Sequence, residues 1–281
     1  MPPRRKIRRR VQTVRAVRPN VGLEKEYRRR LQRLVQKMAK SVEYHLRAEY
    51  RRNEGKIGLI AQDASPAVEL QKMLRSLLRR WQKVFSEEGR KIAYWLVSRA
   101  KGRGNSAMKN ALKAAGITVE FKPSRAEQYM VSSLIEANVA LIKTIPEEYF
   151  TRIEGMVQRS VQAGRDVGQL TEELYDSFDI TRKRAAMIAR DQNNKVTDGL
   201  NRVRDAGLGI EEGIWIHVPG KKSSRHSHMM MDGKRFKLSE GMYDPDVGRF
   251  VHCGELVNCQ CIYQPVIPTF GEQTGGEEAD E

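Results

Sequence analysis

The fold of this chain is decided by the stretch that runs from Ile188 to Cys261. It opens on Ile188-Ala189-Arg190-Asp191-Gln192-Asn193-Asn194-Lys195 and passes through Gly213-Ile214-Trp215-Ile216-His217. It then reads Arg225-His226-Ser227-His228-Met229-Met230-Met231-Asp232-Gly233-Lys234 and closes on Gly254-Glu255-Leu256-Val257-Asn258-Cys259-Gln260-Cys261. A helical pattern gives way to short strand-like pieces within this stretch, which predicts a small α+β domain.

The chain before this stretch is predicted to be helical over residues 24–207. Between Glu24 and Arg52 apolar side chains recur at steps of three and four, as expected for one helix face; they are Tyr27, Leu31, Leu34, Val35, Met38, Val42 and Leu46. Further helices are expected from Ser65 to about Ala100, from 106 to 115 with Gly116 as C-cap, and from a capping box at 124–127. We expect breaks at Lys101–Asn105, at Pro146, and before a helix capped by Thr181.

After Gly207 the predicted elements are strands, at 213–218, 235–238, 249–251 and 261–266. The fold class is therefore mainly α, with a long helical arm followed by a compact, loop-rich C-terminal α+β domain. We expect a disordered basic arm over residues 1–20, a helical region over 21–180, the C-terminal domain over 181–267 and an acidic disordered tail over 268–281.

Positive charge is concentrated at the N-terminus. Residues 1–52 contain 18 Lys and Arg against 4 Asp and Glu, whereas the whole chain has a net charge of +16. Neutralising phosphates with such residues releases counterions, so the pattern favours DNA binding. The alternatives are a solvated leader or, for the basic amphipathic helix, an anionic membrane or acidic partner. The candidate DNA-binding residues are Arg4, Arg5, Lys6, Arg8, Arg9, Arg10, Arg15, Arg18, Arg28, Arg29, Arg30 and Arg33.

The composition also limits the location of the chain. No run of about 18 apolar residues exists, so no membrane span is expected. The N-terminus lacks the apolar segment of a secretory signal. All three cysteines lie between Cys253 and Cys261, which is not a disulfide framework and fits a reduced, cytosolic setting.

Six of the eight His and Cys residues fall between His226 and Cys261. Thiolates and imidazoles clustered in this way indicate one structural zinc ion, which would stabilise a small domain with a thin core. The best candidate ligands are His228, Cys253, Cys259 and Cys261. The alternative is a reduced cysteine cluster packed against strands, because Cys-x-Cys is less usual than Cys-x2-Cys in such sites.

Two further polar groups have functional interpretations. The polar run Arg190–Lys195 is expected to dock onto the following domain or a partner, or else to be a solvated helix with one ion pair. Arg225, His226, His228 and Asp232 could form an acid–base cluster of a nucleic-acid-processing or toxin-like enzyme, and a Cys–His pair is also conceivable. Since no nucleophile elbow, P-loop or HExxH helix is present, we predict that the chain is not an enzyme.

The four motifs in this order resemble the C-terminal domain of phage Mu F-type minor head proteins, the phage head morphogenesis proteins. The resemblance covers about residues 181–266, and its motif residues are Arg190, Asp191, Gln192, Asn194, Trp215, Arg225, Asp232, Gly233 and Asn258. The family motif ends in Cys-Arg-Cys, whereas this chain has Cys259-Gln260-Cys261, so no role of a central arginine carries over.

The resemblance implies a protein present in few copies inside the head, near the portal, that acts in head assembly and in DNA packaging or delivery. The implied partners are the portal protein, the major capsid or scaffolding protein, and packaged double-stranded DNA. The implied location is the virion, with the host cytoplasm during assembly. A plain DNA-binding adaptor remains an alternative. Broad apolar helix faces, including Trp81 and Trp95, predict a partner surface within residues 24–207.

Overall fold

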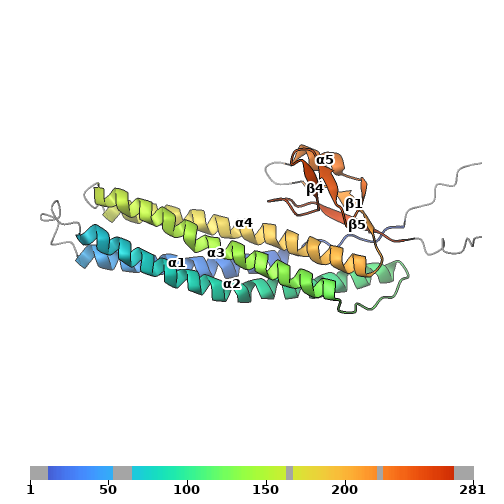
Figure 1. Cartoon of the computed structure of the whole chain (residues 1–281), viewed down its shortest axis with the longest axis horizontal. Coiled ribbons are helices and arrows are strands. Elements are labelled where there is room, and N and C mark those ends of the chain that lie inside the picture. Colours follow the sequence, from blue (N-terminus) through green and yellow to red (C-terminus); the bar gives the residue numbers. More distant parts are fainter. Residues whose placement is uncertain (1–11, 53–64, 163–166, 220–223, 269–281) are drawn as a thin grey trace, which may run out of the picture. The chain divides into compact units, whose positions relative to one another are not determined.

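The computed structural model describes residues 12–52, 65–162, 167–219 and 224–268. It is mainly α-helical with a small antiparallel β region near the C-terminus, so the predicted fold class is confirmed (Figure 1). The elements are α1 (Val21–Arg52), α2 (Ser65–Ala114), α3 (Arg125–Gln162), α4 (Val167–Gly207), β1 (Glu212–Ile216), α5 (His226–Met231), β2 (Arg235–Lys237), β3 (Met242–Asp244), β4 (Arg249–Val251) and β5 (Ile262–Val266).

The chain forms two compact units. The helical unit contains the described residues of 20–99 and 131–193, and the sheet unit contains those of 12–19, 100–130 and 194–268. The boundaries fall inside α2, α3 and α4. This division differs from the predicted boundary at residue 180, because α4 continues as one helix through that position.

The helical unit is held together by the predicted apolar stripe of α1. All seven predicted stripe residues are buried, and Leu23 and Tyr50 extend the stripe at its two ends. Polar contacts add specificity between helices: the Tyr27 hydroxyl donates to Asn138 Oδ1 at 2.9 Å, and Arg30 lies 4.3 Å over the Trp95 ring. The four helices lie side by side in this unit (Figure 1).

The predicted break at Pro146 is wrong, because α3 continues through this residue. Ile142 and Ile145 before the proline and Phe150 after it are fully buried. Burial of both halves outweighs the one backbone hydrogen bond that proline removes. The predicted cap at Thr181 is wrong for a similar reason, since this buried hydroxyl lies within α4 and donates to the Ser177 carbonyl at 2.8 Å.

The predicted break at Lys101–Asn105 is also wrong, because α2 is continuous to Ala114. A Cβ placed on Gly104 would lie 2.8 Å from Arg204 Nη1, so this glycine allows α2 and α4 to approach closely within the sheet unit. In the helical unit, a Cβ on Gly89 would lie 2.9 Å from Ile142 Cγ2. These glycines therefore serve helix packing and do not end a helix.

The predicted helix ends that depend on local chemistry are confirmed. Gly116, two residues after the end of α2, has φ +80°, and its N–H donates to the Lys113 carbonyl at 3.0 Å. At the start of α3, the Glu127 N–H donates to Ser124 Oγ at 3.1 Å, which is the first half of the capping box. Caps form because they satisfy backbone groups that a helix end leaves without a partner.

The sheet unit contains a three-stranded antiparallel sheet in the order β2-β1-β5 and a separate β3–β4 pair. Four of these strands lie where strands were predicted, whereas β3 and the short helix α5 were not predicted. Its core is aromatic: the fully buried Trp215 contacts Phe236, and Phe236 contacts Tyr263, both edge to face. The register places Ile216 opposite Ile262, which brings the end of β1 to the start of β5.

The N-terminal segment corrects the prediction of a disordered arm. Residues 1–11, including Arg4, Arg5, Lys6, Arg8, Arg9 and Arg10, lie outside the described residues, as do residues 269–281 of the predicted acidic tail. Residues 12–19 pack into the sheet unit: Thr13 pairs with Val266, and the Val14 N–H donates to the Pro265 carbonyl at 3.2 Å. Val14 and Val17 are buried, because they pack in one apolar cluster with Met108, Leu112 and Ile267.

The two tryptophans named for the predicted partner surface are covered by the chain itself. Trp81 is only 7% exposed and packs edge to face on Phe85, while Trp95 lies beneath Arg30. The tryptophans therefore give no ground for a partner surface. No helix among the described residues has the length and apolarity needed to cross a membrane.

Candidate metal centre

Three segments of the sheet unit meet at the candidate site. The first is the end of β1, where Trp215 points into the core and His217 follows the strand. The Trp215 N–H donates to the Lys234 carbonyl and the Gly233 N–H donates to the Trp215 carbonyl, both at 2.9 Å. Asp232 Oδ1 accepts the His217 N–H at 2.7 Å. Gly233 has φ +73°, which glycine adopts without strain. These hydrogen bonds connect the predicted Asp-Gly turn to β1.

The second segment is α5, which carries His228. This imidazole is 2% exposed and packs edge to face on the Trp215 ring at 5.3 Å. Arg225, directly before α5, donates from Nη2 to the Val257 carbonyl at 2.9 Å. The arginine thus joins the start of α5 to the loop that carries the cysteines.

The third segment is the loop that leads into β5 and contains Cys259 and Cys261. Asn258 has φ +61°, a left-handed conformation that asparagine tolerates better than most residues, and it turns the chain immediately before Cys259. Asn194 Nδ2 donates to the Cys259 carbonyl at 2.9 Å. This contact confirms part of the predicted docking of the polar run, whose members Asp191, Gln192, Asn193 and Asn194 are all buried.

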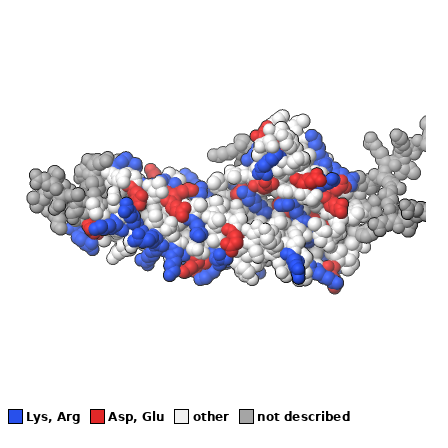
Figure 2. All heavy atoms as spheres, in the orientation of Figure 1, with Lys and Arg blue, Asp and Glu red and all other residues white. Residues whose placement is uncertain are grey.

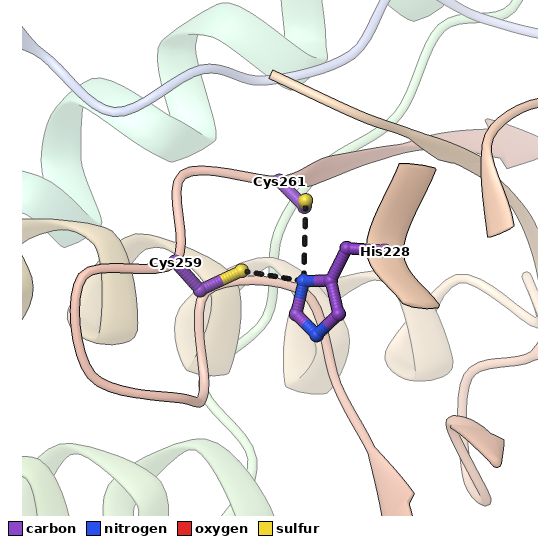
Figure 3. A group of neighbouring side chains, drawn as sticks. All are labelled: His228, Cys259 and Cys261. Atoms are coloured by element: carbon purple, nitrogen blue, oxygen red, sulfur yellow. Dashed lines mark hydrogen bonds between the residues drawn. The ribbon is translucent and has the colours of Figure 1, made fainter. Parts of the chain in front are cut away.

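His228, Cys259 and Cys261 converge from these segments, and their ligand atoms lie within 4.8 Å of one another (Figure 3). His228 Nδ1 lies 3.4 Å from Cys259 Sγ and 3.6 Å from Cys261 Sγ. All three residues are buried. An imidazole and two thiols with this arrangement could hold a metal ion, as predicted for these three residues.

A fourth side chain lies at the edge of this group. His217 Nδ1 is 3.5 Å from Cys261 Sγ, and His217 Nε2 is 3.2 Å from Ser224 Oγ. A pocket of about 300 Å³ is lined by both histidines, both cysteines and Arg225. Gln260 also lines it, so a neutral amide occupies the position where the family motif has arginine.

The surroundings alter the proton affinities of the group. A hydrogen bond from the Cys259 thiol lowers the pKa of Cys261 to about 7, and the same contact together with burial raises the pKa of Cys259. Burial lowers the pKa of His228, but contacts with Cys259 and Asp244 outweigh it, so the net shift is upward. His228 Nε2 lies 3.2 Å from Asp244 Oδ2, and Asp244 is fully buried. The arrangement therefore provides one readily ionised thiol beside an imidazole that is oriented by a carboxylate.

Cys253, the fourth predicted ligand, is not in this group. It is 1% exposed in the apolar core with Ile210 and Val251, and burial raises its pKa well above the usual range. Sequence reasoning missed His217 because the β1–β5 register, which places His217 beside Cys261, depends on pairing between distant segments. The only local signal was its position two residues after Trp215.

The four residues of the possible acid–base cluster have different partners. Arg225 binds the Val257 carbonyl, His228 faces Asp244, and Asp232 accepts the His217 N–H. His226 is exposed at the start of α5. The four side chains therefore do not share one site: His228 belongs to the group with Cys259 and Cys261, Arg225 and Asp232 hold neighbouring backbone, and His226 faces outward.

The basic residues predicted to contact DNA differ in their surroundings. Arg15, Arg18, Arg29 and Arg33 are exposed, and Arg29 pairs with Glu26 at 2.8 Å. Arg30 is engaged by Glu26 and Trp95. On the face in Figure 2, basic side chains gather along the lower edge of the helical unit, with acidic ones among them.

Comparison with known proteins agrees with the motifs. A family model described as Phage Mu protein F like protein matches residues 151–264. An uncharacterized protein of Haemophilus influenzae (strain ATCC 51907 / DSM 11121 / KW20 / Rd) is 26% identical over 246 residues, which is 86% of this chain. The chain spans about half the length of this curated relative, 52%. No solved structure matches. The resemblance that the motifs indicated is thus confirmed: residues 151–264 of this chain match the family of phage Mu protein F like proteins.

Proposed function

We propose that this chain is a phage minor head protein that acts in head assembly and in DNA packaging or delivery. The observation that carries the proposal is the family match over residues 151–264. The motif residues behind the resemblance support it, because Asn194, Trp215, Arg225 and Asp232 all hold one site together. Residues that hold one site together suit a structural task.

We propose the portal protein as the main partner, with the major capsid or scaffolding protein as further candidates. The chain would lie inside the head in few copies, and in the host cytoplasm during assembly. The test is quantitative mass spectrometry of purified procapsids and of portal isolated from them. A few copies per particle that co-purify with portal are expected. A copy number close to that of the major capsid protein, or absence from particles, would contradict the proposal.

We further propose that the basic N-terminus contacts packaged DNA without sequence preference. Its support is the concentration of 18 Lys and Arg in residues 1–52. Replacing Arg4, Arg5, Lys6, Arg8, Arg9 and Arg10 with Gln is expected to reduce the slope of log affinity against log salt by up to about 5. Fluorescence anisotropy with a double-stranded oligonucleotide at several salt concentrations measures this slope.

Two further variants locate the DNA surface. The first variant tests α1 and replaces Arg28, Arg29 and Arg33 with Gln. Arg30 is kept in this variant because it packs over Trp95. The control replaces Lys72 and Lys91, which already pair with Glu69 and Glu88 at 2.9 and 2.7 Å. If the control changes the slope by as much for each positive charge removed as the N-terminal variant does, binding depends on total charge and the arm has no special role.

We also propose that the group His228, Cys259 and Cys261 holds one zinc ion with a structural role. Its support is the distance of at most 4.8 Å between buried soft ligand atoms. Freshly purified protein is expected to contain about one equivalent of zinc, and Cys259→Ser should remove it and lower the melting temperature. Metal analysis that finds none in protein never exposed to chelator would refute this part.

A further inference from the structure

We propose that His217 is the fourth ligand and closes a Cys2His2 zinc centre with His228, Cys259 and Cys261. This inference rests on the zinc site proposed above and names the residue that completes it. A structural zinc ion takes four ligands in a tetrahedron. The group of three therefore leaves one position, which the chain or a water molecule must fill.

Three of the distances between ligand atoms match those of a tetrahedral site. With Zn–S about 2.3 Å and Zn–N about 2.05 Å, a tetrahedral angle places nitrogen and sulfur about 3.6 Å apart. The three N···S distances here are 3.4 Å for His228 and Cys259, 3.6 Å for His228 and Cys261, and 3.5 Å for His217 and Cys261. His217 thus stands in the same relation to Cys261 as His228 does. It lies outside the group whose ligand atoms are all within 4.8 Å of one another, so its ring must move closer to the other ligands when the ion binds.

Both imidazoles are held in the same way. Each turns Nδ1 toward the cysteines and has a partner at Nε2: Asp244 Oδ2 for His228 and Ser224 Oγ for His217, each at 3.2 Å. A hydrogen-bonded second nitrogen is the usual outer partner of a ligating histidine, because it fixes the tautomer and the orientation of the ring. The Asp232 carboxylate, which accepts the His217 N–H at 2.7 Å, positions the backbone of that ligand.

Charge balance also favours this set. Two thiolates and two neutral imidazoles neutralise a divalent ion, so the ion and its four ligands together carry no net charge. Among the residues outside the group of three, His217 has a ligand atom 3.5 Å from the Cys261 sulfur, whereas His226 is exposed at the start of α5. Four protein ligands close the coordination sphere, which assigns the ion to holding β1, α5 and the loop before β5 together.

The test uses the full chain, freed of metal and titrated with Co²⁺ and with Zn²⁺ against a chromogenic chelator. The wild type should bind one Co²⁺ with the strong visible bands of a four-coordinate site and thiolate charge transfer. His217→Ala should weaken Zn²⁺ by more than the roughly 10–100-fold that loss of an outer partner costs, and should change the visible bands. His217→Cys should restore four-coordinate bands with stronger thiolate absorption.

His226→Ala is the matched control, because it removes a neighbouring exposed histidine and should leave affinity and spectrum unchanged. Circular dichroism of each variant establishes that the helices are intact. If His217→Ala binds as the wild type while Cys259→Ser loses the ion, His217 is not a ligand and the three-residue zinc site stands. If the wild type binds no metal, both proposals are refuted. If His226→Ala weakens binding equally, the assignment of His217 is overturned.

Discussion

At the scale of single residues, two histidines of the sheet unit have opposite net pKa shifts although burial lowers the pKa of both. Burial lowers the pKa of His252 to about 4, and the nearby Arg202 acts in the same direction. His228 is buried as well, yet its pKa is raised, because Cys259 and Asp244 favour its charged form. A partner of suitable charge therefore decides whether a buried group remains ionised.

Asp198 provides a residue-scale prediction. Burial raises its pKa to about 6, although Arg202 Nε donates to Asp198 Oδ2 at 2.8 Å. The folded state thus binds the proton of Asp198 more tightly than the unfolded state does. The free energy of unfolding therefore falls as the pH rises from about 4 to about 6, and the full cost of the charged form is present above pH 6. Asp198→Asn should raise the free energy of unfolding at pH 8 by up to about 3 kcal/mol, less what the lost Arg202 pair contributes. Urea unfolding at pH 4 and pH 8 measures the difference, and an equal loss of stability at both values would show that the ion pair dominates.

At the scale of elements, the long helices persist through residues that usually end helices. Pro146 and Gly104 both lie within helices because the flanking turns are buried. Tertiary burial on both sides contributes more than the local penalty, which is about 1 kcal/mol for glycine and about 3 kcal/mol for proline. Helix length in this protein is therefore a property of packing.

Two glycines of α2 provide an element-scale prediction. Gly104→Ala should lower the free energy of unfolding by about 1–3 kcal/mol, because the new methyl group meets Arg204, which is held by Asn201 at 2.7 Å and by Asp205. Gly102→Ala should instead raise it by about 0.5–1 kcal/mol, because nothing lies within 4 Å of its Cβ and alanine favours helix. Thermal and urea unfolding of both variants tests the pair. Equal effects of the two substitutions would contradict the packing role of Gly104.

At the scale of the whole molecule, segments far apart in sequence build the sheet unit together. Residues 12–19 and 100–130 join the strands near the C-terminus. Val14, Val17, Met108, Leu112 and Ile267 form one buried cluster. Asn201 Nδ2 also donates to the Val17 carbonyl at 3.0 Å. The sheet unit is thus incomplete without its N-terminal segment.

This assembly leads to a prediction for truncations. Removing residues 1–19 should lower the free energy of unfolding by about 2–4 kcal/mol, because two buried valines and the pairing with β5 are lost. Removing only residues 1–11 should cost much less, since these contacts begin at Gln12. Urea unfolding of both truncations distinguishes the cases. Equal stability of the two proteins would mean that the packing of residues 12–19 is energetically unimportant.

The sequence by itself determined the features that depend on neighbouring residues. The apolar stripe of α1, the cap at Gly116, the capping interaction at Ser124 and the Asp232-Gly233 turn were all predicted, because each depends on groups only a few positions apart. The clustering of His228, Cys259 and Cys261 was also predicted, since they lie within a short stretch.

The tertiary structure decided what distant pairing controls. Whether Pro146 or Gly104 ends a helix depends on the surface it meets, and a sequence pattern carries no information on that surface. The place of His217 beside Cys261 and the exclusion of Cys253 both follow from how the loop before β5 and the strands meet. Strand register is set by the packing of a whole sheet face, so a ligand supplied across strands becomes visible only in the folded chain.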